Sequence, residues 1–143
     1  MNKKILLTHL FLLFTLAFFT ACDKEDPDLT KTDILVAETW KGDQVLVNGV
    51  DVSDRQEVIN EVGRIKTAHM KFDRNGTYRA TYESNEGQEE ETGTWEFNED
   101  ETTITFDLYG EVNVVRLTDR NLDFMAKIPF QGVIFDAEVK FVK

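Results

Sequence analysis

Short runs of alternating apolar and polar residues, separated by turn-forming residues, fill the chain from Ile65 to its C-terminus. Such alternation is typical of antiparallel strands with one buried face. Together with a first strand from Trp40 to Val47, which ends at the turn signal Asn48-Gly49, these runs predict eight strands. Consecutive hairpins favour an up-and-down meander, and closing it into a barrel removes the exposed edges that promote aggregation. We therefore predict an all-β fold, an eight-stranded up-and-down antiparallel barrel with one short helix between strands 1 and 2.

The predicted helix has recognisable ends. Ser53 and Gln56 have the spacing of a capping box, and Gly63 suits a C-terminal cap. The apolar face of this helix consists of Val58, Ile59 and Val62. A helix this short is marginal alone, so we expect it to pack on an apolar surface. A single helical turn, capped by Thr32-Asp33, is expected before the first strand.

Hairpin register follows from the requirement that apolar residues on neighbouring strands share a face. A three-residue loop, Arg74-Asn75-Gly76, sets Phe72 against Tyr78 and places its glycine where positive φ is needed. The same test predicts loops at 98–101, 109–111 and 129–132, which set Trp95 beside Ile104, Phe106 beside Val114 and Ile128 beside Val133.

One join in the predicted meander is ambiguous. Leu117 and Leu122 suit a cross-strand pair, but that pairing conflicts with an inward-facing Val114 on the same strand. A bulge, which adds one residue to one strand of a pair, would satisfy both.

The N-terminus carries the three zones of an export signal. Lys3 and Lys4 precede an apolar run from Ile5 to about Phe19, which is followed by small residues and then by Cys22. A permanent membrane helix needs roughly 20 apolar residues, and this run is shorter. We therefore predict a signal peptide over residues 1–21.

Phe19-Thr20-Ala21-Cys22 resembles the bacterial lipobox, in which small residues precede a cysteine that receives diacylglycerol. This resemblance makes Cys22 the lipid-attachment site, residues 22–31 a lipidated tether and residues 32–143 the barrel domain. Two or three acyl chains such as palmitate would anchor firmly, because each buried methylene contributes about 0.8 kcal/mol. Lys24-Glu25-Asp26 resembles the signal that sends Bacteroidota lipoproteins to the cell surface. The expected location is the outer membrane, either surface-exposed or facing the periplasm.

Composition narrows the function. Loss of Lys3 and Lys4 with the signal peptide would change the formal net charge from −11 to −13. A chain this acidic is a poor partner for nucleic acid or anionic lipid, both of which need basic surface. Because Cys22 is the only cysteine, no internal disulfide can form, and the domain must be stable through its own core.

Several segments resemble lipocalin-like lipoproteins of Bacteroidota. Thr39-Trp40-Lys41-Gly42 resembles their opening strand, in which a tryptophan closes one barrel end. The segment from Phe72 to Tyr78 resembles their second hairpin, and Gly93-Thr94-Trp95 the strand after it. Arg116-Leu117-Thr118 with Leu122 resembles their late hairpin. The resemblance covers residues 32–143 and implies a lipocalin-like barrel, while leaving the activity open.

Inward-facing aromatic residues and one arginine are the candidates for ligand binding: Tyr78, Tyr82, Trp95, Phe106, Arg116, Phe124 and Phe135. The rings would either line a cavity or fill it, because an eight-stranded barrel is just wide enough to be packed with side chains. Tyr78 and Tyr82 favour a wet cavity, since each hydroxyl needs a partner. Arg116 would face the interior and capture a carboxylate if Val114 faces inward, or face water if the bulge turns Leu117 inward.

No constellation for catalysis or metal binding is found in the sequence. After cleavage His69 is the only histidine, and its place between Ala68 and Met70 points it away from the apolar face. Glu89-Glu90-Glu91 and Glu99-Asp100-Glu101 are consecutive, so their carboxylates diverge, and we interpret them as solvated charge rather than a calcium site. No metal, cofactor or enzymatic activity is predicted.

The leading hypothesis is a membrane-anchored exported lipoprotein whose barrel binds a small apolar ligand. The alternative is a structural or protein-interaction subunit of the cell envelope with a solid core and no small-molecule ligand. A cavity inside the barrel would distinguish the two.

Overall fold

The computed structural model describes residues 29–130 and 133–143. Two helices, α2 (Lys31–Val36) and α3 (Gln56–Val62), accompany the strands in this part of the chain. The strands are β1 (Thr39–Val47), β2 (Val50–Asp51), β3 (Arg64–Phe72), β4 (Thr77–Glu83), β5 (Gln88–Phe97), β6 (Thr103–Phe106), β7 (Gly110–Leu117), β8 (Asn121–Phe130) and β9 (Val133–Val142). The predicted signal peptide, Cys22 and most of the tether lie outside the described residues.

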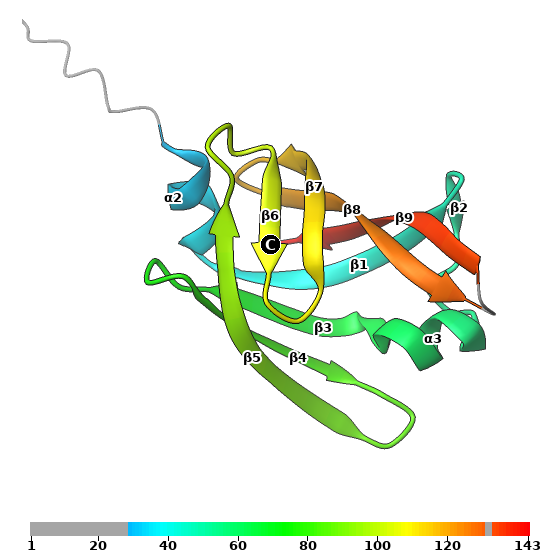
Figure 1. Cartoon of the computed structure of the whole chain (residues 1–143). Coiled ribbons are helices and arrows are strands. Elements are labelled where there is room, and N and C mark those ends of the chain that lie inside the picture. The colour runs from blue at the N-terminus through cyan, green and yellow to red at the C-terminus, as the bar shows by residue number, and fades with distance from the viewer. Residues whose placement is uncertain (1–28, 131–132) are drawn as a thin grey trace, which may run out of the picture.

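The strands form a closed antiparallel barrel (Figure 1). Sequential neighbours pair from β3 to β9, and β1 closes the barrel by pairing with β3 on one side and β9 on the other. The predicted eight-stranded up-and-down barrel is therefore confirmed, with α3 between its first and second strands as expected. β2 is an additional short strand that folds back on β1 through Asn48 and Gly49, both at positive φ.

The hairpin between β3 and β4 has the predicted register. Phe72 lies opposite Tyr78 and Met70 opposite Ala80. Gly76 has a φ of 83°, which a residue with a side chain rarely adopts.

Three later registers differ from the prediction. Trp95 pairs with Phe106 instead of Ile104, and Phe106 itself lies opposite Gly110 instead of Val114. Ile128 pairs with Phe135 instead of Val133. Each pairing is displaced by an even number of positions, so every side chain keeps its predicted face while the loop lengths change.

Local hydrogen bonds explain why the β5–β6 loop is longer than predicted. The Asn98 side-chain oxygen accepts hydrogen bonds from the backbone N–H groups of Thr102 and Thr103 at 2.8 and 3.0 Å. These two bonds satisfy backbone N–H groups within the turn, so β6 starts at a later residue than predicted. At the other end of β6, Leu108 and Tyr109 are exposed in the turn instead of extending the strand.

β7 contains the bulge that the sequence required. The register shifts between Val114 and Arg116, and Leu117 pairs with Leu122. Val115, at the bulge, is exposed. Both apolar pairings of the ambiguous join are therefore satisfied.

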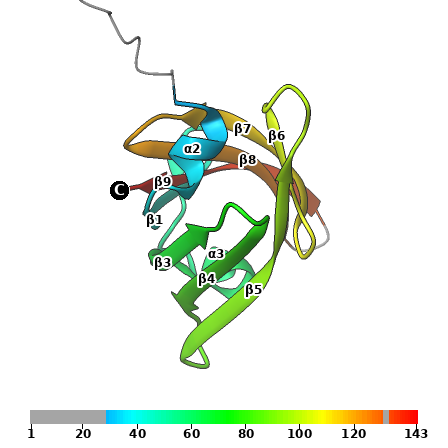
Figure 2. The ribbon, with the colours of Figure 1, turned by 90° about the vertical axis from the view of Figure 1, so that its left-hand side faces the viewer.

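One barrel end, called here the closed end, is covered by α2 (Figures 1 and 2). Trp40 is fully buried, and its indole N–H donates to the Leu35 carbonyl at 2.8 Å. The Lys143 ammonium lies 4.7 Å from the indole ring centre, within the range of a cation–π contact. The tryptophan closes the end as the resemblance implied.

The predicted caps of the two helices are corrected by the structure. α2 is capped by Thr30, which forms a complete capping box with Asp33, instead of by Thr32-Asp33. α3 starts at Gln56 without any side-chain cap. Ser53 does not cap it, because its hydroxyl accepts from the Val45 N–H and donates to Asp51.

α3 lies at the opposite end of the barrel from α2 (Figures 1 and 2). Ile59 is its buried residue, and Val58 and Val62 pack against the core. Gly63 ends it at a φ of 73°, with its N–H bonded to the Ile59 carbonyl, so the predicted C-cap is confirmed. No helix in residues 29–130 and 133–143 is long and apolar enough to span a membrane.

Candidate ligand-binding site

The closed end of the barrel is packed with aromatic side chains. Phe72 packs edge-on against Trp95, with ring centres 5.5 Å apart, and Tyr78 packs edge-on against Phe106 at 5.2 Å. The Trp95 indole donates to the backbone carbonyls of Thr77 and Asp73 at 3.0 and 3.2 Å. Aromatic rings therefore fill this half of the interior.

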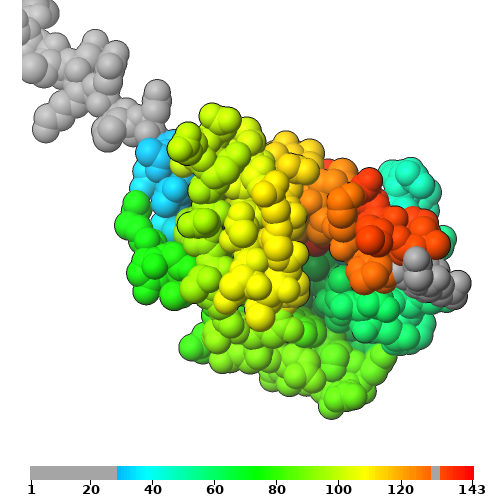
Figure 3. Space-filling view, viewed as in Figure 1, coloured from blue at the N-terminus to red at the C-terminus, as the bar shows by residue number. Residues whose placement is uncertain are grey.

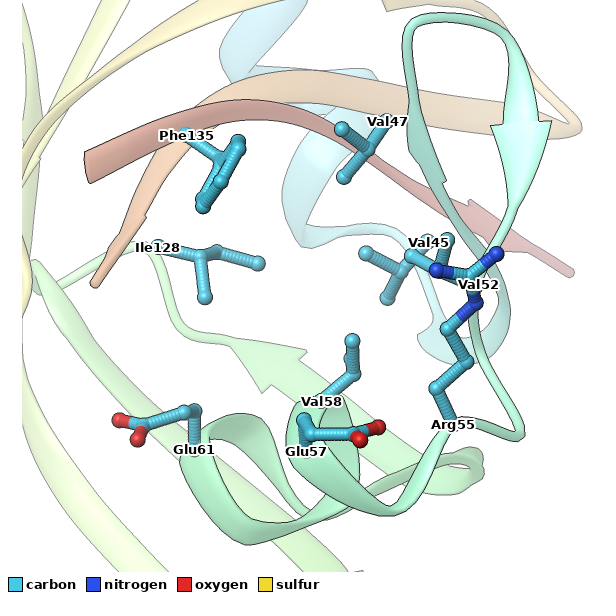
Figure 4. Close-up of a pocket in the computed structure, with 9 residues that line it drawn as sticks. All are labelled: Val45, Val47, Val52, Arg55, Glu57, Val58, Glu61, Ile128 and Phe135. Carbon is cyan, nitrogen blue, oxygen red and sulfur yellow. The ribbon is translucent and has the colours of Figure 1, made fainter. Parts of the chain in front are cut away.

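The other half is hollow and contains two cavities. The first, which we call the lid cavity, has a volume of about 490 Å³ and lies between α3 and the inner face of the sheet. In Figure 4, Phe135 and Ile128 from β8–β9 and Val47 from β1 point toward Val58 on α3 across an open centre. Its remaining lining residues are Val45, Val52, Arg55, Glu57 and Glu61. The walls are apolar, and the charged groups come from α3 and the segment just before it.

The second cavity, which we call the barrel cavity, has a volume of about 370 Å³ and lies deeper in the sheet. The space-filling view shows a hollow between the β6–β7 hairpin, β8 and α3 (Figure 3). Inward-facing residues of six strands line it, among them Ile65, Met70, Ala80, Tyr82, Phe106, Val112, Phe124, Ala126, Val139 and Phe141. Glu61, His69, Glu111 and Lys127 add charged or polar groups to the same lining.

The two cavities meet where α3 contacts β8. Glu61 and Ile128 belong to the lining of both. The two cavities are therefore neighbours. Glu61 on α3 and the Ile128 side chain lie at the boundary between the lid cavity and the barrel cavity.

A polar group interrupts the apolar lining of the barrel cavity. The Tyr82 hydroxyl donates to Glu91 Oε1 at 2.7 Å, which raises the pKa of Tyr82 to about 12. Glu91 lies opposite Ala80 in the β4–β5 pair, so it shares the inward face with Tyr82. Its second oxygen, Oε2, is buried and has no partner among the described residues.

Tyr78 places a second hydroxyl beside this pair. The side chain is 2% exposed, and its hydroxyl has no hydrogen-bond partner among the described residues. Burial, together with the nearby carboxylates of Asp107 and Glu91, raises the pKa of Tyr78 to about 12. The phenol therefore stays protonated at neutral pH and offers both a donor and an acceptor.

The sequence-predicted ligand residues are distributed over four places. Tyr82, Phe106 and Phe124 line the barrel cavity, and Phe135 lines the lid cavity. Tyr78 and Trp95 belong to the packing of the closed half, and neither is part of either lining. Arg116 lies on the outer face, away from both cavities.

Arg116 is bound by a neighbouring acid. Its Nε and Nη2 both lie 2.7 Å from Asp123 Oδ2 on the next strand. Asp123 is 2% exposed, while the arginine side chain is 48% exposed. The guanidinium therefore covers a buried carboxylate and is not directed at the interior, as expected if the bulge turns Leu117 inward.

Several residues that line the barrel cavity, or that bond to its lining, are absent from the sequence-predicted set. Met70 and Ala80 lie on the predicted inward face, but neither is aromatic, so nothing in the sequence distinguishes them from core residues. Glu91 stands within Glu89-Glu90-Glu91, a run that by itself indicates solvated charge. The signal for its role is strand alternation, which turns Glu90 outward toward Arg79 and Glu91 inward toward Tyr82.

His69 is exposed, as predicted, but it stands at the margin of the barrel cavity. Its Nδ1 lies 3.0 Å from the Thr67 carbonyl. Among residues 29–130 and 133–143, no three His, Cys, Asp or Glu side chains are grouped to hold a metal ion.

A closed eight-stranded up-and-down barrel is the architecture of the lipocalin class of proteins. Residues 36–124 match the family model of the lipocalin-like domain, so the chain belongs to this family. A comparison with curated protein sequences found no match.

Solved lipocalin structures have the same fold. The complex of bovine odorant-binding protein with a selenium-containing odorant superposes with a TM-score of 0.53 at 18% identity, covering 84% of this chain and 76% of that one. Bovine odorant-binding protein with its natural ligand superposes with a TM-score of 0.50 at 18% identity, covering 74% and 69%. At this identity the likeness concerns the fold alone.

Proposed function

We propose that this chain is an exported lipoprotein whose lipocalin-like barrel binds a small apolar ligand at the hollow end. The observation that carries the proposal is the pair of adjoining apolar cavities beneath α3. Their volumes, about 370 and 490 Å³, fall in the range of roughly 300–1,000 Å³ typical of ligand sites.

The physical basis is burial of apolar surface. Each square ångström of apolar ligand surface removed from water contributes about 25 cal/mol to binding. The valine, isoleucine and phenylalanine side chains of the walls form no hydrogen bonds to water that a ligand would have to break. A preformed cavity also lowers the ordering cost of binding. That the odorant-binding proteins are named for ligands held in the same fold supports the proposal.

Attachment to the outer membrane through lipid on Cys22 is the second part of the proposal. It is supported by the lipobox resemblance and by the absence of another cysteine in the sequence. The described residues start at Leu29, next to α2 and the closed end (Figure 1). A tether joined there leaves the hollow end on the far side of the barrel from its attachment point.

The ligand proposal is tested with residues 23–143, which contain every strand of the barrel and its core. Native mass spectrometry would detect co-purified ligand, and the neutral fluorophore N-phenyl-1-naphthylamine would report on uptake into the apolar cavities. Ala126→Trp fills the barrel cavity and should abolish uptake there, whereas Thr92→Trp on the exposed side of β5 should not.

Absence of both ligand and probe uptake in the wild-type domain would contradict the proposal. That result would favour the alternative, an interaction subunit of the envelope. Equal loss of uptake in both tryptophan variants would show that the probe does not report on the barrel cavity.

A further inference from the structure

Two phenols and two carboxylates lie next to one another beside the barrel cavity, and we call Tyr78, Tyr82, Glu91 and Asp107 the polar cluster; of these four, Tyr82 belongs to the lining of the cavity. Tyr82 belongs to the cavity lining and holds Glu91 through its hydroxyl at 2.7 Å. Tyr78 packs against Phe106 and Tyr109, two further residues of that lining, with ring centres 5.2 and 6.5 Å apart. The cluster therefore lies directly behind the apolar wall on the β4–β6 side.

Gly93 lets two members of the cluster approach each other. A Cβ built on this glycine would stand within 3 Å of both the Tyr78 hydroxyl and Asp107 Oδ1. Any other residue at this position would displace them. The missing side chain thus brings a phenol and a carboxylate to the same point.

Two buried polar atoms of the cluster have no partner among the described residues. They are the Tyr78 hydroxyl and Glu91 Oε2. Leaving such a group unsatisfied is unfavourable, since desolvation is not offset by a new bond. Two of them beside one cavity indicate a place where a bound molecule supplies hydrogen-bond donors.

The charged groups around the cavity indicate the sign of the charge that the bound molecule carries. Glu61 and Glu111 line the cavity, and Glu91 and the exposed Asp107 lie near Tyr78 beside it. Of the two basic groups in the lining, the Lys127 ammonium bonds Asp136 at 3.0 Å, and His69 Nδ1 faces the Thr67 carbonyl.

No other cation in the described lining of the barrel cavity competes for a ligand carboxylate. The Arg116 guanidinium, which the sequence suggested for that role, covers Asp123 on the outer face. The negative groups at the cavity consequently outnumber the available positive ones, and the acidic whole chain adds to the same potential.

We infer that the ligand is an amphipathic amine, whose apolar body fills the barrel cavity and whose ammonium group binds in the polar cluster. An ammonium has three donors and no acceptor, which matches Glu91 Oε2, the Asp107 carboxylate and the lone pair of the Tyr78 hydroxyl. This inference rests on the proposed function and adds the chemical class of the ligand to it.

Three probes with the same eight-carbon chain test the class: octylamine, 1-octanol and octanoate. Calorimetry on residues 23–143 at pH 7 should show octylamine binding at least tenfold more tightly than octanoate, with 1-octanol between them. Equal affinities for all three would overturn the amine inference while leaving apolar binding intact. No binding of any probe would overturn both.

Glu91→Gln removes the charge of the cluster while keeping its shape, and we expect about a tenfold loss of octylamine affinity. The matched control is Glu90→Gln, because Glu90 lies on the same strand but faces outward toward Arg79. Affinity for 1-octanol should be unchanged in both variants. An octylamine affinity that falls equally in both, or in neither, would contradict the inference.

Discussion

Tyr78→Phe is expected to stabilise the ligand-free protein, although it deletes a buried hydroxyl. The ring and its contacts with Phe72 and Phe106 stay in place, so the packing of the closed half is preserved. The substitution removes only the hydroxyl, which has no hydrogen-bond partner among the described residues. An unsatisfied buried polar group costs about 1–3 kcal/mol, and part of that cost should be recovered.

The magnitude follows from the environment of the hydroxyl. Tyr78 is 2% exposed, so water gives the hydroxyl little compensation in the folded state. We expect a gain of about 1 kcal/mol in the free energy of unfolding, which corresponds to about 4 °C in Tm for a domain of this size. The same variant should bind octylamine several-fold more weakly.

Tyr82→Phe provides the opposite control. Its hydroxyl donates to Glu91 Oε1 at 2.7 Å, and its loss would leave both oxygens of that carboxylate without a partner among the described residues. A bond to a charged group contributes about 1.5–3 kcal/mol, so this variant should be destabilised by about that amount.

Urea unfolding of the two variants, with and without octylamine, measures both effects. The reasoning about orphaned atoms is refuted if Tyr78→Phe is destabilised by about 1 kcal/mol or more without ligand. Such a result would mean that the hydroxyl makes a stabilising bond in the folded protein.

Three further outcomes are expected. Because the folded protein raises the pKa of Tyr78 and Tyr82 from 10 to about 12, it disfavours their ionised forms, so the free energy of unfolding should be unaffected by these phenols below pH 10 and should fall as the pH rises toward 12. Tyrosinate absorbance and circular dichroism would follow this loss, and a flat stability between about pH 9 and 12 would contradict it. Arg116→Ala should cost about 1–3 kcal/mol in urea unfolding, because it uncovers the buried Asp123 while the guanidinium itself is 48% exposed; no change would show that the carboxylate is satisfied otherwise. Cys22→Ser should release the domain from membranes in cell fractionation, and a wild-type chain that starts elsewhere and is soluble would refute lipid attachment.

The faces of the strands could be predicted from the sequence because side-chain direction has a period of two. Phe72 against Tyr78 and the bulge that lets Leu117 pair with Leu122 both followed from this rule. The period does not fix loop length, since displacing a hairpin by an even number of positions keeps every face. This is why the sequence pattern matched Trp95 with Ile104 when the structure pairs it with Phe106.

The candidate site was only partly predictable because alternation gives the face of a residue but not its depth along the barrel. Trp95 and Phe124 both point inward, yet one packs the closed half and the other lines the barrel cavity. The inward direction of Glu91 could not be recognised from the sequence for a different reason. Three consecutive glutamates suggest solvent, and only pairing with β4 shows that the middle one faces outward while Glu91 faces inward.

The helices at the two ends of the barrel differ in how they are held. α2 has a capping box between Thr30 and Asp33, and Arg74 binds the same aspartate at 2.6 Å. These bonds lower the pKa of Asp33 to about 2, so the carboxylate remains an acceptor at any physiological pH. α3 has no side-chain cap at its N-terminus, because Ser53 is bonded to Asp51 and Val45. A short helix without a cap is stabilised mainly by its packing, and the packing of α3 faces the two cavities. The helix beside the candidate site therefore lacks the side-chain cap that fixes α2, and low local stability is a property that ligand-binding segments commonly share.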